Sequence, residues 1–287
     1  MIALIGASGQ LGAALLEAWP GEISAPAHAE VDFLDRAALE VFLDRLRPAV
    51  LVNCSAFHNV DACERTPRPA FEANALAVDA AAEACAARGI VFVTISTDYV
   101  FDGRATRPYD ETDAPNPLSA YGASKFAGEL LARRHGGRHL IVRTSGVYGK
   151  SGTSNKGYTF IERILQQAER GEPLRIVDNM TFSPSYAPHV ARVIVDLIER
   201  QAFGTYHVTG AGGTTWYDYA KTALDALGLR ADLTAITYDA FGAGTKRPLF
   251  SPLRSVTLAA AGVEPAPAWE DGLAAFLAER ARRRTPA

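Results

Sequence analysis

Apolar residues in the first half of the chain form short continuous runs that alternate with longer segments rich in alanine and leucine. The runs at residues 2–5, 50–53, 90–96 and 139–144 predict strands, and the segments at residues 11–19, 39–46, 71–87 and 120–134 predict helices. Because these strands are apolar on both faces, both faces of their sheet are expected to be covered. Such alternation indicates right-handed crossovers and an α/β fold with a doubly wound parallel sheet of the Rossmann type.

The alternation changes at about residue 150. Residues 1–150 are therefore interpreted as mainly a dinucleotide-binding Rossmann domain. Residues 151–287 are interpreted as mainly a small substrate-binding cap, with some segments returning to the first domain. The expected elements of this half are a polar loop at 149–157, helices at 158–170, 189–200, 216–227 (N-cap Thr214 or Thr215) and 269–284, strands at 175–177 and 205–209, and a loop containing Pro184 and Pro188. A pocket is expected between cap and sheet.

Three glycines follow the first predicted strand and open the first predicted helix. Gly6 permits a tight turn, Gly9 lets the backbone approach a pyrophosphate, and Gly12 permits close packing of helix on strand. The helix N-terminus then offers free N–H groups to phosphates. A second glycine cluster, residues 210–213, is interpreted as a connecting loop because no parallel βαβ unit follows it.

The end of the second strand usually carries the residue that distinguishes NAD from NADP. Residues 22–28 show neither a clear acid nor a clear base for that role. Asp32 lies about 20 residues beyond the glycine loop, the usual distance, but it suits the adenine end equally well. The choice between NADPH and NADH therefore stays open.

Tyr121 and Lys125 are four residues apart in a predicted helix and therefore share one face. A nearby ammonium is expected to lower the pKa of a tyrosine, which would let Tyr121 protonate a carbonyl oxygen as hydride reaches the carbon. Lys125 also suits the ribose hydroxyls of a nicotinamide cofactor. Thr97 follows the strand at 90–96, where ligands of open α/β sheets bind, and its hydroxyl suits a developing oxyanion.

The composition is that of a globular protein and excludes a chain that is mainly disordered, collagen-like or coiled coil. Hydrophobic residues make up 48% of the 287 residues, charged residues make up 21%, and the net charge is −3. No nucleic-acid or membrane partner is indicated. The three cysteines leave one unpaired in any disulfide scheme, and the histidines show no metal-ligand spacing, so no metal is expected. The first apolar run is too short for a leader peptide, and a cytoplasmic protein is expected.

Taken together, these motifs resemble those of extended short-chain dehydrogenases/reductases, and more closely of the dTDP-4-dehydrorhamnose reductases. The resemblance covers nearly the whole chain. It is carried by Gly9-Gln10-Leu11-Gly12, Val52-Asn53 through Val60-Asp61, Ser96-Thr97-Asp98-Tyr99-Val100-Phe101, Tyr121-Gly122-Ala123-Ser124-Lys125, Arg143-Thr144-Ser145, Tyr206-His207-Val208 with Trp216, Arg247-Pro248 with Ser251 and Leu253, and Trp269-Glu270. It implies reduction of the 4-keto group of a nucleotide-linked deoxysugar by NADPH or NADH, with hydride from the B-face of the nicotinamide.

The resemblance also implies roles for individual residues. Thr97, Tyr121 and Lys125 would form the catalytic triad. The cofactor would be held by Gly6, Ser8, Gly9, Gln10, Leu11, Gly12, Asp32, Phe33, Cys54, Ser55 and Ala56, together with Tyr121 and Lys125. Asp98, Tyr99, Gly146 and Arg247 would face the nucleotide sugar, and a homodimer is a possible assembly.

Two positions depart from the pattern of that family. The family usually has tryptophan where this chain has Gly146, and Gly-x-Pro-Thr where this chain has residues 182–185. Both positions belong to the substrate side, so a wider pocket for a larger keto sugar is one hypothesis.

Alternative functions are weighed on the same residues. A 4,6-dehydratase would need an acidic residue after Asp98, where this chain has Tyr99. A related epimerase or reductase with another substrate stays open. So does a non-catalytic nucleotide-binding subunit resembling the regulatory β subunit of methionine adenosyltransferase, although the retained triad favours an enzyme.

Overall fold

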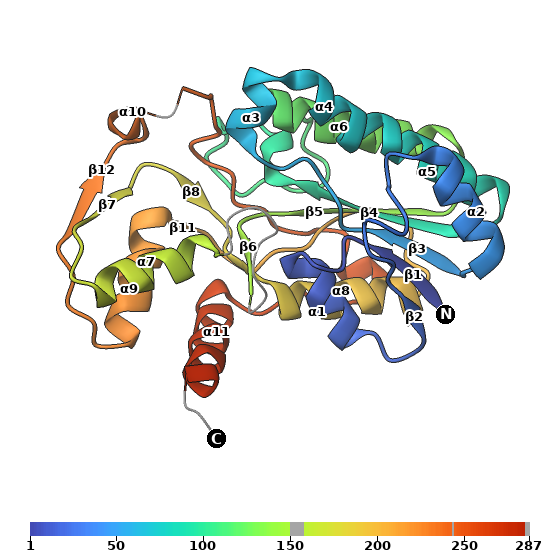
Figure 1. Ribbon diagram of the computed structural model, residues 1–287. Coiled ribbons are helices and arrows are strands. Elements are labelled where there is room, and N and C mark those ends of the chain that lie inside the picture. The colour runs from blue at the N-terminus through green and yellow to red at the C-terminus, as the bar shows by residue number, and fades with distance from the viewer. Residues whose placement is uncertain (150–157, 243, 285–287) are drawn as a thin grey trace.

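The computed structural model describes residues 1–149, 158–242 and 244–284. The predicted loop at 149–157 therefore lies outside the described residues, except for Gly149. The centre of the molecule is a six-stranded parallel sheet (Figure 1), which confirms the predicted fold class. Its strands, in order across the sheet, are β10 (Gly204–His207), β5 (His139–Thr144), β4 (Val91–Thr97), β3 (Val50–Asn53), β1 (Ile2–Ile5) and β2 (Ile23–Ser24).

Helices cover both faces of the sheet (Figure 1). One face packs on α1 (Gln10–Ala18) and α8 (Ala187–Glu199), and the other packs mainly on α2 (Arg36–Leu46), α5 (Ala77–Ala87) and α6 (Ala120–Arg134). Successive residues of β1 show why the strand is apolar throughout. Ile2 and Leu4 belong to the first core, while Ala3 and Ile5 belong to the second, because side chains alternate across a strand.

The predicted helix at 71–87 is longer and less regular than expected. A short helix, α3 (Val60–Arg65), precedes it, and the helical run then consists of α4 (Pro67–Phe71), the π-helix η1 (Glu72–Leu76) and α5. The π turn carries Asn74, whose buried amide holds the loop after β3. π turns of this kind often occur at functional sites. A 3-10 turn, η2 (Asp98–Val100), similarly follows β4.

Segments from the second half of the chain return to the sheet. β10 pairs with β5, and α8 packs in the layer beside α1. The boundary between the two predicted domains stays a proposal. The prediction that Pro188 lies in a loop is wrong, because α8 begins at Ala187 and the first helical turn needs no N–H from proline.

The remaining elements of the second half form the smaller cap seen on the left in Figure 1. They are β6 (Val147–Tyr148), α7 (Phe160–Glu169), β7 (Leu174–Val177), β8 (Thr181–Phe182), β9 (Ser185–Tyr186), β11 (Thr214–Thr215), α9 (Trp216–Ala226), β12 (Leu233–Ile236), α10 (Tyr238–Phe241) and α11 (Trp269–Arg284). The 3-10 turn η3 (Ala259–Ala261) instead packs Ala261 against the core of the sheet. Short pairs β6–β9, β7–β12 and β8–β11 replace a second large sheet.

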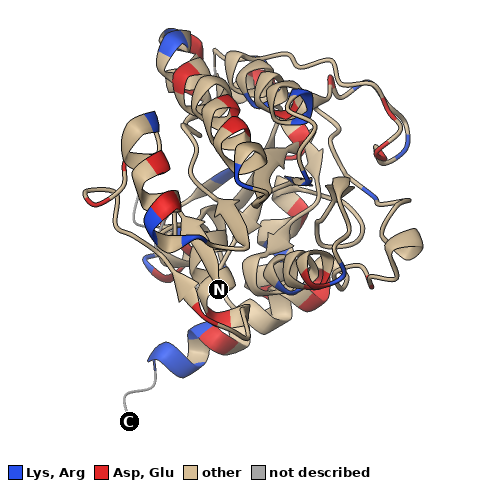
Figure 2. Cartoon of the chain, turned by 90° about the vertical axis from the view of Figure 1, so that its right-hand side faces the viewer, with Lys and Arg blue, Asp and Glu red and all other residues tan. Residues whose placement is uncertain are grey.

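The acidic and basic residues lie mainly on the outer helices, with the basic end of α11 next to the C-terminus (Figure 2). Among the described residues, no helix is both long and apolar enough to cross a membrane.

Candidate functional site

A cavity of about 430 Å³ lies where the carboxyl ends of β3, β4 and β5 meet the cap. This is the edge at which open α/β sheets bind ligands. Its lining comes from the sheet edge, from α6 and from the cap: Cys54, Ser55, Ala56, His58, Val60, Ile95, Ser96, Thr97, Asp98, Tyr99, Tyr121, Lys125, Thr144, Ser145, Gly146, Val147, Met180, Thr181, Phe182, Trp216 and Ser251. The three predicted catalytic side chains are therefore brought into one cavity.

Local packing places Tyr121 beside the end of β4. The hydroxyl of Ser119 caps α6 by accepting from the N–H of Gly122 at 3.2 Å. A Cβ at Gly122 would lie 2.2 Å from the carbonyl oxygen of Tyr99, so only glycine lets α6 approach η2 this closely. The ring of Tyr121 consequently lies edge-on to that of Tyr99, with centroids 5.8 Å apart.

Burial decides the ionisation of the tyrosine and the lysine. It raises the pKa of Tyr121, and the hydrogen bond with Thr97, which acts to lower that pKa, does not offset the loss of water. The expectation that Lys125 lowers the tyrosine pKa is therefore wrong for this structure. Burial also lowers the pKa of Lys125 to about 8, although the negative charge of Glu129 acts to raise it. At neutral pH the phenol is thus protonated and the lysine is mostly an ammonium ion.

A buried ionic network lies beneath Lys125. Glu129, one helical turn further along α6, is 1% exposed and accepts from Nε and Nη2 of Arg143 at 2.9 and 2.7 Å. The hydroxyl of Ser96 donates to the same carboxylate at 2.5 Å. Burial by itself would raise the pKa of Glu129, but the bonds from Arg143 outweigh it and hold that pKa below its usual range. The network joins α6 to β4 and β5.

Asp98 is a second buried carboxyl group, and its partners within the described residues are hydroxyl and backbone groups. It accepts from the hydroxyl of Ser251 at 2.6 Å and from that of Thr97 at 3.1 Å. Burial raises the pKa of Asp98 to about 6, although these hydroxyl groups favour the ionised form. When the carboxyl group of Asp98 is ionised, it therefore accepts a hydrogen bond from the hydroxyl of Thr97.

The loop after β3 is held by two asparagines. Asn53 accepts from the N–H and the hydroxyl of Ser55 at 3.0 and 2.6 Å. Asn74 makes two hydrogen bonds to the backbone of Phe57, both at 2.9 Å. Burial raises the pKa of the Cys54 thiol in this loop to about 12, so it stays a neutral thiol.

The glycine loop has the geometry of a close βα turn. Gly6 has a φ of +80°, and a Cβ at Gly12 would lie 2.2 Å from the carbonyl oxygen of Gly6. Gly9 provides no side-chain cap to α1, so the first N–H groups of the helix remain available. Both polar atoms of the Gln10 side chain are buried without a hydrogen-bond partner in the described part of the chain. Leu11 packs its side chain in the core, whereas Ser8 is exposed.

Several predicted binding residues lie outside the cavity lining. The glycine loop does so, as do Asp32, Phe33 and Arg247. Asp32 accepts from the N–H of Leu34 at 2.9 Å, and Phe33 is buried in the core. That burial leaves Phe33 only its backbone for a cofactor. Arg247 forms an ion pair with Asp61 at 3.1 Å.

The space beside Gly146 is filled rather than open. Gly146 has a φ of +50°, and a Cβ there would lie 2.4 Å from Cε2 of Phe182. Gly146 lines the cavity, and the ring of Phe182 occupies the place that a side chain at position 146 would take, so a wider pocket stays a hypothesis.

Sequence reasoning missed several lining residues from the cap. Met180, Thr181, Trp216 and Ser251 all reach the cavity. Trp216 and Ser251 were among the residues that carry the resemblance, but no role was assigned to them, and only the packing of the cap on the sheet brings all four to the cavity. Ser145 had a usable signal, because it follows β5 at the same sheet edge as Thr97. No group of three His, Cys, Asp or Glu side chains suited to a metal ion occurs within residues 1–149, 158–242 and 244–284.

Comparison with known proteins gives consistent relatives. The sequence model of a family described as the RmlD substrate binding domain matches residues 1–282. The chain is 33% identical over 282 residues to the spore coat polysaccharide biosynthesis protein SpsK of Bacillus subtilis (strain 168), covering 97% of each chain. It is 34% identical over 260 residues to the dTDP-4-dehydrorhamnose reductase of Salmonella typhimurium, covering 86% of this chain and 85% of the relative.

A solved structure extends the likeness to three dimensions. It is the dTDP-4-dehydrorhamnose reductase of Bacillus anthracis str. Ames in complex with NADP, which matches with a TM-score of 0.92 and 31% identity. The match covers 97% of this chain and 98% of that chain.

Proposed function

This chain belongs to the RmlD substrate binding domain family, and from that membership we propose that it reduces the 4-keto group of a dTDP-linked 6-deoxysugar with NADPH or NADH. The observation that carries the proposal is geometric. Thr97, Tyr121 and Lys125 line one buried cavity at the carboxyl edge of the parallel sheet. The related structure bound to NADP supports the choice of cofactor.

The residues present fit a nicotinamide dinucleotide. The free N–H groups at the start of α1 suit its pyrophosphate, and the unpartnered amide of Gln10 lies beside them. The loop at Ser55 and Ala56 and the ammonium of Lys125 suit the nicotinamide half, while Asp32 suits the adenosine end. When bound, the cofactor supplies hydride to the ketone carbon.

Side chains of the protein supply the proton that the ketone oxygen receives. The phenol of Tyr121 stays protonated until the ketone oxygen gains negative charge, and it then donates its proton to that oxygen. Lys125, in the same cavity, would bind the ribose hydroxyls of the cofactor beside the phenol. Thr97 donates to the same oxygen when its hydroxyl turns away from Asp98, and Tyr99 and Ser145 complete this side of the sugar site.

Replacing the phenol tests this assignment. Tyr121→Phe is expected to lower turnover of dTDP-4-keto-6-deoxysugar by roughly 10²–10⁴-fold, because it removes one general acid. NADPH consumption measures turnover, and calorimetry with NADPH measures cofactor binding, which should stay near its original strength. Near-normal turnover in the variant would contradict the role of Tyr121.

The wild-type chain provides the test between function classes. Cofactor and nucleotide-sugar binding without turnover on a panel of 4-keto sugar nucleotides would favour the non-catalytic subunit. Turnover of another member of the panel only would favour the related enzyme with a different substrate.

We further propose that the protein acts in the cytoplasm as a homodimer. The free thiols of Cys54, Cys63 and Cys85 support a reducing compartment. Exposed Leu76 and Leu130 lie on the neighbouring elements η1 and α6, and this apolar surface suits a second copy of the chain. A monomeric mass in light scattering would contradict the dimer.

A further inference from the structure

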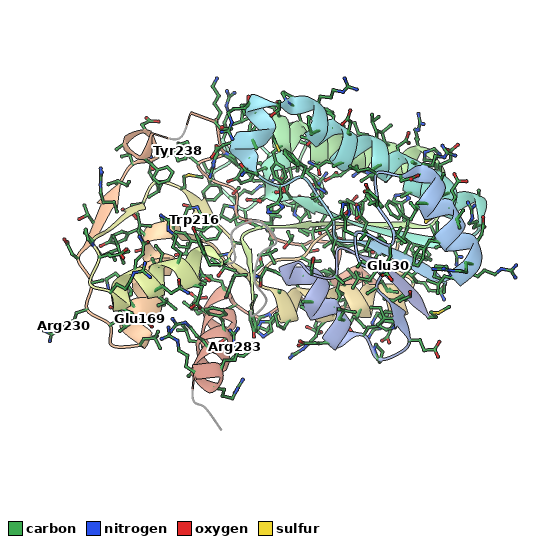
Figure 3. The ribbon with its side chains drawn as sticks, viewed as in Figure 1. Glu30, Glu169, Trp216, Arg230, Tyr238 and Arg283 are labelled. Atoms are coloured by element: carbon green, nitrogen blue, oxygen red, sulfur yellow. The ribbon has the colours of Figure 1, made fainter. Side chains whose placement is uncertain are left out.

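The cavity has an aromatic part that the proposed reaction does not yet use. Phe182, in β8, is 4% exposed, and its ring stacks on that of Trp216 with centroids 3.8 Å apart and planes 11° from parallel. Trp216, labelled in Figure 3, comes from the start of α9 in the cap. Both rings line the same cavity as Thr97 and Tyr121. The cavity therefore combines polar groups of the sheet edge with a flat apolar surface from the cap.

The position of this surface depends on Gly146. A Cβ at that residue would lie 2.4 Å from Cε2 and 2.6 Å from Cδ2 of Phe182. The N–H of Ser185 donates to the carbonyl oxygen of Gly146 at 3.2 Å, so the two segments are also joined through their backbones. Positions 146 and 182 thus compete for one space, and this chain fills it from position 182.

The ring of Phe182 is held firmly in this place. Trp216 supports one side, and the ring of Phe160 meets Trp216 edge-on at 4.6 Å. The ring of Tyr219 lies edge-on to Phe182 at 5.8 Å. Such aromatic pairs fix ring orientation, so the surface is ready before a ligand arrives.

We propose that Phe182, supported by Trp216 and given its space by Gly146, is the residue that selects the sugar by packing against its apolar edge at C5 and C6. The inference rests on the proposed function and names the residue by which the site would prefer a methyl group to a hydroxymethyl group at C5. A hydroxyl group at C6 would lose water against the rings and gain no hydrogen bond from them. Pockets of this kind discriminate by roughly 10–200-fold for a small group.

Inhibition by two stable nucleotide sugars tests the proposal. dTDP-6-deoxyglucose and dTDP-glucose differ only by the hydroxyl group at C6. We expect the first to inhibit the wild-type reductase at least about 10-fold more strongly. In Phe182→Ala this ratio should fall toward one, and the KM for the keto sugar should rise about 10-fold or more, while the KM for NADPH stays unchanged. An unchanged ratio in Phe182→Ala would overturn the proposal.

A matched variant separates selection from folding. Phe160→Ala removes another ring of the same cluster, but Phe160 does not line the cavity. It should lower the Tm and keep the inhibition ratio. A ratio that falls equally in both variants would show a structural effect of the cluster and would overturn the role of Phe182.

A double-mutant cycle tests the competition for space. Gly146→Ala should raise the KM for the keto sugar more in the wild type than in Phe182→Ala, because only the wild type has the ring in contact. Equal effects in both backgrounds would contradict the coupling. If the wild type reduced no 4-keto sugar at all, the proposed function would fail, whereas the inhibitor pair, then measured by calorimetry, would still report on Phe182.

Discussion

The sheet edge and the cap build their halves of the cavity by different means. At the sheet edge, hydrogen bonds and ion pairs hold several polar side chains in place, as with Glu129 between Arg143 and Ser96. In the cap, stacked rings such as Phe182 on Trp216 form the surface. Directional bonds position the groups that must act on one reacting atom. Ring packing shapes the space around the rest of a ligand.

The largest expected effect is that of a substitution in the ionic network of Glu129, Arg143 and Ser96 on the sheet side. Glu129→Ala leaves Arg143 as a buried cation without its main partner, which should lower the free energy of unfolding by about 3–5 kcal/mol. Urea denaturation measures the change. Glu129→Gln is the control, because it keeps one acceptor for Arg143 and should cost less. Equal, small losses in both variants would show that the network contributes little to stability.

Asp98 allows a smaller test through pH. Its folded pKa of about 6 lies above its ordinary value of 3.8, so the folded state holds the proton more tightly. The stability that this group contributes is present below pH 4 and is lost as pH rises through 6, by on the order of 2–3 kcal/mol at most.

Asp98→Asn removes that titration. Relative to wild type, the variant should therefore gain stability progressively between pH 4 and pH 6, as measured by urea denaturation at several pH values. A difference between the two proteins that does not change with pH would contradict the raised pKa of Asp98.

The smallest expected effect concerns the cap. The hydroxyl of Thr215 caps α9 by accepting from the N–H of Asp218 at 3.0 Å. Thr215→Ala should cost about 1 kcal/mol of stability. Because α9 begins at Trp216, the KM for the sugar should change more than the KM for NADPH. Thr215→Ser keeps the cap and serves as the control; a loss as large as that of Thr215→Ala would argue against the capping bond.

The sequence predicted the sheet side of the molecule well. Helix 120–134 and strand 139–144 have the predicted bounds, and Thr215 is one of the two predicted caps. Tyr121 and Lys125 also reach the cavity as their spacing indicated. These features depend on contacts between near neighbours in the chain, which periodicity reports directly.

The same reasoning did less well where burial was unknown. It expected Lys125 to lower the pKa of Tyr121, but the pKa rises because the phenol loses water. It counted Phe33 among the cofactor residues without showing that the ring is buried in the core, which leaves only its backbone for that predicted role. Motif spacing reports neither dehydration nor which face of a loop is covered.

The sequence by itself determined the order of strands and helices, the glycine turn and the polar groups that end β4 and begin α6. Only the tertiary structure decided that Ser251 reaches Asp98 and that Phe182 fills the space beside Gly146. Those contacts join segments far apart in the chain. They depend on how the cap packs on the sheet, and no local pattern of apolar and polar residues encodes that packing.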